Sequence, residues 1–159
     1  MEEREILSGT VRRASELDAA AILALVPRLV DFGPPPWRDT AEMTEADLSV
    51  IADALTSMSD DPAIFVAEID GQVVGFVHVR SMEDYYRRHP HGHVADLVVA
   101  RKAEGLGIGK RLLEQAEMWA RGLSFDWLSI AVFEENVRAL ALYEKVGYRK
   151  DITRLIKQL

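Results

Sequence analysis

The chain of 159 residues contains no cysteine. This absence excludes disulfide bonds, zinc sites built on thiolates and cysteine nucleophiles. It suits a reducing compartment, so we expect a cytoplasmic protein. The opening residues, MEEREILSG, are charged rather than apolar, which argues against a signal peptide. No apolar run approaches the roughly 20 residues that cross a bilayer, so no membrane partner is expected.

Basic residues are in the minority, because 19 Lys and Arg stand against 26 Asp and Glu, for a net charge of -7. Nucleic acid is therefore not expected as a partner, since phosphate binding needs clustered basic side chains. An acidic balance suits a cationic substrate, although solubility alone also explains it. Repeats, low-complexity segments and linkers are all absent, so we expect a single domain over residues 1–159.

One segment, His93 to Arg121, joins a β-branched apolar run, a turn with three glycines and an amphipathic pattern. A strand, a glycine turn and a helix in this order bring free N–H groups and a positive helix end together, which attracts phosphate. A plain tight turn explains the glycines equally well. The turn is not a Walker A loop or a dinucleotide fingerprint, because Glu104 and Lys110 replace required glycines. Hydride transfer and NTP hydrolysis are therefore not expected.

The remaining patterns predict an α+β domain with a mixed sheet. Ser15 or Asp18 can cap the first helix, and Thr44 with Asp47 resembles a capping box for the second. Asp70-Gly71 predicts a hairpin turn. The expected strands are 10–13, 63–68, 73–80, 94–99, 125–132 and 148–159; the expected helices are 18–30, 44–58, 108–121 and 136–146; the expected loops are 31–40 and 81–92.

Two stretches resemble signature motifs of the GNAT superfamily of N-acetyltransferases. The segment ADLVVARKAEGLGIGKRLLEQAEMWA resembles motif A, although Glu104 stands where the superfamily prefers Arg or Gln. The segment VFEENVRALALYEKVGY resembles motif B, N-x-x-A-x-x-L-Y-x-x-x-G-Y. Weaker similarity at the first strand and helix and at the 63–80 hairpin extends the resemblance over nearly the whole chain. A carboxylate at position 104 should repel a pyrophosphate, unless it points to solvent or pairs with Lys102, Lys110 or Arg111.

The resemblance implies a fold and a reaction. The fold is a central, mostly antiparallel twisted sheet of six to seven strands, splayed at the motif A strand and flanked by about four helices. The reaction is acetyl transfer from acetyl-CoA to a small primary amine by direct attack in a ternary complex, with no metal, in a possible homodimer. Protein amines, longer acyl donors and a non-catalytic acyl-CoA-binding regulatory module remain as alternatives.

The resemblance also assigns residues to the donor site. Tyr143 would protonate the departing thiolate, or it is simply a half-buried core tyrosine. Asn136 would bind the CoA arm, act as a helix N-cap, or do both. Backbone groups of Leu97, Val98 and Val99 would pair with the pantetheine arm. The pyrophosphate cradle would consist of Glu104, Gly105, Leu106, Gly107, Ile108, Gly109 and Lys110.

The acceptor side is less closely specified by the resemblance. His93 falls at the strand position where the resemblance places the general base. Histidine titrates near neutrality and so suits that role, but His93 could also be an ordinary surface histidine. Asp96 is a rival base, acting directly or through water. The expected edge of the amine pocket combines acidic and aromatic side chains, namely Trp37, Glu83, Asp84, Tyr85 and Tyr86.

Overall fold

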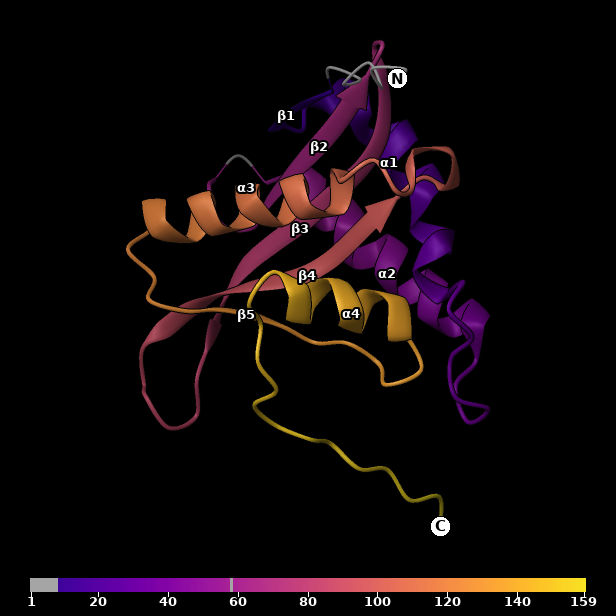
Figure 1. Ribbon diagram of the computed structural model, residues 1–159, viewed down its shortest axis with the longest axis vertical. Helices are drawn as coiled ribbons and strands as arrows, with labels where there is room; N and C mark the ends of the chain where they lie inside the picture. Colours follow the sequence, from indigo (N-terminus) through magenta and orange to yellow (C-terminus); the bar gives the residue numbers. More distant parts are fainter. Residues whose placement is uncertain (1–8, 58) are drawn as a thin grey trace, which may run out of the picture.

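The computed structural model describes residues 9–57 and 59–159, and its centre is one five-stranded sheet in the order β1-β2-β3-β4-β5 (Figure 1). The first four strands pair antiparallel and β5 pairs parallel with β4. The strands are β1 Thr10–Arg13, β2 Ala63–Ile69, β3 Gln72–Glu83, β4 Pro90–Val99 and β5 Leu128–Ile130. The helices are α1 Ala19–Leu25, α2 Thr40–Leu55, α3 Ile108–Gly122 and α4 Val137–Lys145, with 3₁₀ turns at Glu16–Asp18, Val26–Val30 and Arg101–Ala103. The predicted α+β mixed sheet is confirmed.

The sheet separates two apolar clusters because successive side chains of a strand point to opposite faces. Phe76 of β3 packs with Ile22 and Ile51 on the face covered by α1 and α2. Its neighbour Val77 packs with Leu112 of α3 on the other face, which α4 also covers. Figure 1 shows this arrangement of helices on both sides of the strands.

The second helix begins earlier than the sequence pattern predicted. Asp39 caps it, since its carboxylate accepts hydrogen bonds from the N–H groups of Ala41 (2.8 Å) and Glu42 (3.0 Å). The predicted start at Thr44 is wrong because Asp39 is the first capping residue after the prolines and nothing beyond it interrupts the helix. Asp47, expected in a capping box, is therefore free for another role. Met58, assigned to the apolar stripe of this helix, lies outside the described residues.

The first helical segment is capped by Ser15, whose N–H donates to Asp18 Oδ2 at 2.8 Å. The expected continuous helix over 18–30 is wrong beyond Leu25, where the chain continues as a 3₁₀ turn. Pro27 explains the change, because it has no N–H for the α-helical ladder.

Both hairpins form, and the second is longer than predicted. Asp70 and Gly71 adopt the positive φ angles, 50° and 75°, of the expected β2–β3 turn. The predicted loop over 81–92 is wrong, since β3 and β4 stay paired until Glu83 faces Pro90. The backbone pairing thus continues through a stretch of polar side chains. A strand prediction based on apolar residues could not detect this part of the hairpin.

The C-terminal part of the sheet is smaller than expected. The strand predicted over 125–132 shrinks to the three residues of β5, and 148–159 forms no strand. The sheet therefore has five strands rather than six to seven, because the C-terminal residues find no pairing partner within the described chain. In the described part, none of the helices is long and apolar enough to span a membrane.

Candidate active site

The main opening in the sheet lies between β4 and β5. These strands pair only where Gly92–Val94 face Leu128–Ile130. Just beyond, β4 carries a bulge: His78 of β3 faces Asp96 while Val79 faces Val94, so Ala95 is an extra residue. A bulge bends its strand. Beyond Val94 the β5-facing edge of β4 is unpaired over its last five residues, 95–99.

The pairing of β4 with β3 decides which backbone groups this free edge offers. Ala100 N–H donates to Val74 O at 2.7 Å, and hydrogen-bonded positions alternate along an antiparallel pair. Val98 consequently points its backbone groups toward β3. Leu97 and Val99 point theirs into the opening, where Arg28 Nε already donates to Val99 O at 2.9 Å. Of the three predicted donor-site residues on β4, two thus present free-edge backbone.

The glycine turn has two different uses for its glycines. Gly105 and Gly107 have φ angles of 77° and 78°, which L side chains rarely adopt, and a Cβ at either would meet nothing within 4 Å. A Cβ on Gly109 would instead lie 3.1 Å from Leu142 of α4, so this glycine permits close helix packing. The N–H groups of residues 105–110 make no backbone hydrogen bond within the described chain. They stand at the N-terminus of the 15-residue helix α3 and so can hold an anion.

Glu104 makes two ion pairs that the sequence did not indicate. Its carboxylate accepts from Arg28 Nη2 at 2.7 Å and from Arg138 Nη1 at 2.6 Å. The hydrogen bond from Arg138, followed by that from Arg28, lowers the pKa of Glu104. The expected pairing with Lys102, Lys110 or Arg111 is wrong. Arg138 lies inside motif B, so the sequence gave some sign that it belongs to the site. No sequence pattern pointed to Arg28, which is 76 residues from Glu104.

The start and middle of α4 carry the two motif B residues of interest. Asn136 is confirmed as the N-cap, its Oδ1 accepting from Ala139 N–H at 3.3 Å. Tyr143 is buried, with 8% exposure. Burial, and then the charge of Asp96, raises the pKa of Tyr143 to about 12. The phenol therefore keeps its proton at ordinary pH and lies within electrostatic reach of Asp96.

His93 belongs to a buried polar cluster centred on Ser129 of β5. Ser129 Oγ lies 2.8 Å from His93 Nδ1 and 2.9 Å from His91 Nε2. The second nitrogen of His91, Nδ1, is buried without a partner among the described residues. Burial, and then the charge of Arg80, lowers the pKa of His93 to about 4. His93 is therefore neutral at ordinary pH and weakly basic.

Asp96 belongs to a second cluster, on the side of the sheet that α2 covers. Its Oδ2 lies 2.8 Å from Nδ1 of His78, which is 1% exposed. Half-buried Asp47 of α2 lies close enough for the charge of Asp96 to act on it: burial first, and then Asp96, raises the pKa of Asp47 to about 6. Sequence reasoning missed Asp47, His78 and Ser129, because only the fold brings these residues together.

The predicted acceptor residues lie apart from this cluster. Tyr85 and Tyr86 are 88% and 82% exposed at the tip of the β3–β4 hairpin, which projects from the sheet (Figure 1). Asp84 accepts from the N–H groups of Tyr86 and Arg87, so its carboxylate stabilises its own turn. Trp37, 46% exposed, belongs to the loop before α2, whose Phe32 stacks on Phe133 beyond β5 at 5.3 Å. Their role in substrate binding stays a prediction.

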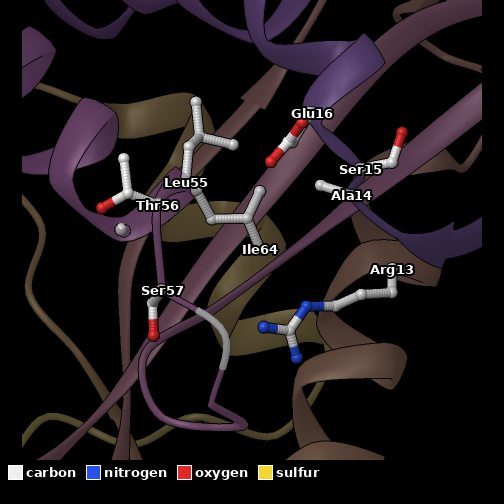
Figure 2. Close-up of a pocket in the computed structure, with 9 residues that line it drawn as sticks. Arg13, Ala14, Ser15, Glu16, Leu55, Thr56, Ser57 and Ile64 are labelled. Atoms are coloured by element: carbon white, nitrogen blue, oxygen red, sulfur yellow. The ribbon is translucent and has the colours of Figure 1, made fainter.

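Two surface hollows lie away from the β4–β5 opening. Figure 2 shows one between the end of α2 and the start of β2, where Arg13, Glu16, Leu55 and Ile64 are among the lining residues. None of the predicted site residues lines it. The other hollow, at the hairpin tip, is lined by Glu83, Asp84, Tyr85 and Arg88.

A splayed pair of strands can take up an extended ligand at its free edge, and a glycine turn opening a helix can hold a phosphate, so the two together suit an extended, phosphate-bearing ligand. The model of the acetyltransferase (GNAT) family matches residues 26–148. The chain therefore belongs to this family and is an acetyl-CoA-dependent N-acetyltransferase.

Individual relatives agree with this assignment. Aminoglycoside N(6')-acetyltransferase type 1 of Stenotrophomonas maltophilia is 30% identical over 145 residues, covering 89% of this chain and 86% of the relative. An uncharacterized N-acetyltransferase of Methanocaldococcus jannaschii is 36% identical over 86 residues, or 54% of this chain, which thus spans about half (51%) of that relative. The structure of aminoglycoside N-acetyltransferase AAC(6')-Iy with CoA superposes with a TM-score of 0.74 over 95% of this chain and 94% of the other, at 17% identity, a likeness of fold.

Proposed function

We propose that the enzyme acetylates a primary amine of a small cationic molecule, which attacks acetyl-CoA directly in a ternary complex. The observation that carries this proposal is the carboxylate pair Asp47 and Asp96 beside the point where β4 leaves β5. A carboxylate such as Asp47, whose ionisation is disfavoured by burial and by the charge of a neighbouring carboxylate, gains from a positively charged ligand. The aminoglycoside-acetylating relative supports a polycationic acceptor.

Donor binding would rest on the glycine turn and its two arginines. The free N–H groups of 105–110 and the dipole of α3 favour the pyrophosphate. Arg28 and Arg138 supply the positive charge that the side chain at position 104 does not. Arg138 is 71% exposed and can turn from Glu104 to a phosphate, whereas Arg28 is also tied to Val99 O. Free backbone groups at Leu97 and Val99 would pair with the pantetheine arm.

Acetyl transfer then needs one proton removed from the attacking ammonium. His91 Nδ1 is buried without a partner, so a proton placed there would be an unpaired N–H. The favoured tautomer of His91 therefore carries its proton on Nε2, which donates to Ser129 Oγ. Ser129 O–H donates to His93 Nδ1, which leaves the His93 proton on Nε2. A nitrogen that carries a proton cannot accept one. This supports Asp96, rather than His93, as the base, with His78 orienting its carboxylate.

The bond changes follow from this assignment. The ammonium first gives one proton to Asp96; the free amine then attacks the thioester carbon, the C–N bond forms, the C–S bond breaks, and the second nitrogen proton is lost to solvent as the amide forms. The sulfur leaves as a thiolate, whose reference pKa near 8.5 lies well below the value of about 12 for Tyr143. Full protonation by Tyr143 is therefore less favourable than the sequence suggested. We assign Tyr143 the donation of a hydrogen bond to the sulfur.

The experiment is a thiol-release assay with acetyl-CoA and a panel of aminoglycosides, polyamines and amino acids. We expect turnover with at least one polycationic amine, and a loss of that turnover in Asp96→Asn while acetyl-CoA binding, measured by calorimetry, persists. Glu45→Gln, an exposed carboxylate on the same helix as Asp47, is the matched control. Binding of acetyl-CoA without turnover for any amine would instead favour the alternative of a non-catalytic acyl-CoA-binding regulatory module.

The same assay separates the remaining alternatives. Propionyl- and succinyl-CoA test a longer acyl donor, and peptides with free N-termini test a protein acceptor. A cytoplasmic location and a homodimer also belong to this proposal.

A further inference from the structure

Arg28 occupies one position on the free edge of β4. Its Nε donates to Val99 O at 2.9 Å, and Val99 O is the last carbonyl that this edge turns toward the β4–β5 opening. The other two nitrogens also have partners, because Nη1 donates to Asp31 at 3.1 Å and Nη2 donates to Glu104 at 2.7 Å. The side chain is only 23% exposed. Three bonds in different directions therefore fix the plane of the guanidinium, whose rigid fork suits such a role.

The backbone that carries Arg28 is fixed as well. Val26, two residues earlier, is fully buried and belongs to the same apolar cluster as Val98 of β4. Pro27, between Val26 and Arg28, restricts the φ angle of the connecting residue. Arg28 thus starts from a rigid root beside β4. Its bond to Val99 O is a built feature of the fold, unlike the contact of a freely moving surface arginine.

The bond from Arg28 changes what the edge of β4 can offer to an extended ligand. The pairing of β5 with β4 ends at Val94, so the later edge is open. Edge groups repeat every two residues, about 7 Å, and an extended ligand with several amides could therefore pair in more than one register. Val99 O is already taken. Of the carbonyls of residues 96–99, only Leu97 O is then left to accept from a ligand N–H, beside the N–H groups of Leu97 and Val99.

We propose that Arg28 is a positioning residue of the donor site, which fixes the register in which the pantetheine arm pairs with β4. This inference rests on the proposed function, in which the arm pairs with Leu97 and Val99. With Val99 O taken, an amide N–H of the arm binds Leu97 O, and the thioester lies beyond it toward Asp96. A slip of one step, to Val99 O, would draw the thioester about 7 Å back from Asp96, too far for transfer.

Lysine at position 28 separates this positioning role from the attraction of phosphate. Its side chain keeps the positive charge but has a methylene group where arginine has Nε, so it cannot donate to Val99 O from the same place. Arg28→Lys should lower kcat by about three- to tenfold, because one hydrogen bond decides between the two registers. The KM for acetyl-CoA should fall by the same factor, since slipped complexes occupy the enzyme without reacting.

Arg101→Lys is the matched control. It makes the same exchange at an arginine that is 77% exposed and that also pairs with Asp31. We expect wild-type kcat and KM from this variant in the thiol-release assay. An unchanged kcat for Arg28→Lys would overturn the proposal. A lower kcat with an unchanged or raised KM would overturn it too, because donor binding would then be weakened rather than shifted in register.

A crystal structure of the wild-type protein with CoA tests the same point without turnover. We expect Arg28 Nε to stay on Val99 O while the arm donates to Leu97 O. CoA bound with Arg28 displaced from Val99 O, or without a bond from the arm to Leu97 O, would overturn the proposal. The two proposals can thus fail separately. An arm in the expected register, with no turnover for any amine, would refute the proposed acetyl transfer and leave the role of Arg28 standing.

Discussion

Replacing Asp47 by Asn should stabilise the fold and impair the enzyme at the same time. The pKa of Asp47 is raised from 3.8 to about 6, by burial and then by Asp96, so its ionised form is disfavoured in the folded state. An amide of the same shape removes that cost. It also removes one of the two charges that we propose hold the acceptor amine.

The size of the stability gain follows from the pKa. A rise of about two units corresponds to about 3 kcal/mol, at 1.36 kcal/mol per unit. Asp47 is only half-buried and solvent screens part of the interaction, so we expect about 1–2 kcal/mol. For a chain of this length such a gain raises Tm by about 3–6 °C. The loss of one charge-assisted contact should raise the KM for the amine about tenfold or more.

The pH dependence of the stability difference between the wild type and Asp47→Asn tests the direction of this effect. The folded state holds a proton on Asp47 up to about pH 6, whereas the unfolded chain loses it near 3.8. Wild-type stability therefore falls, relative to the variant, as pH rises through this window, and the difference is constant above about pH 7. Thermal unfolding at pH 4 and pH 7.5 should show a small gain for Asp47→Asn at the lower pH and the full gain at the higher.

Glu45→Gln is the control, because it removes a charge from an exposed position on α2. A lower Tm for Asp47→Asn at pH 7.5, or an equal gain at both pH values, would refute the electrostatic reasoning. An unchanged KM with a higher Tm would leave the stability argument standing and remove Asp47 from the acceptor site.

Three further substitutions test the rest of the site. Tyr143→Phe should lower kcat roughly 10–100-fold and leave the calorimetric Kd for acetyl-CoA nearly unchanged; a large loss of binding would assign Tyr143 to packing instead. Glu104→Gln should tighten CoA binding several-fold at low salt, less so at high salt, by freeing Arg138 and removing a negative charge; weaker binding would mean that Glu104 positions the arginines productively. Ser129→Ala should lower the free energy of unfolding by about 1–3 kcal/mol in urea titrations, since two buried imidazoles lose their partner, and an unchanged value would rule out the hydrogen-bonded cluster.

Features set by local chemistry were predictable from the sequence. The turn at Asp70-Gly71, the N-cap at Asn136 and the positive φ at Gly105 depend on residues a few positions apart. The family motifs have the same local character, which is why they pointed to the donor half of the site.

Features set by distant pairing were not predictable. The partners of Glu104 lie 76 and 34 residues away, and Asp47 meets Asp96 only after α2 packs on the sheet. The apolar run around β5 correctly indicated a strand, but its length depends on pairing with β4, which covers only Leu128–Ile130. The predicted strand at 148–159 likewise has no pairing partner among the described residues.

The bulge at Ala95 sets a rule for protein engineering. Residues three apart on a regular strand point to opposite faces, yet Val94 and Leu97 both pack toward α3, because the extra residue resets the alternation. Deleting Ala95 would remove the extra residue and leave a regular strand, on which Val94 still points toward α3 and the next residue, Asp96, still lies beside His78 on the opposite face. Libraries along β4 can therefore combine substitutions with the deletion of residue 95, whereas deleting one residue of the regular part, such as Leu97, would exchange the two faces of the strand beyond it.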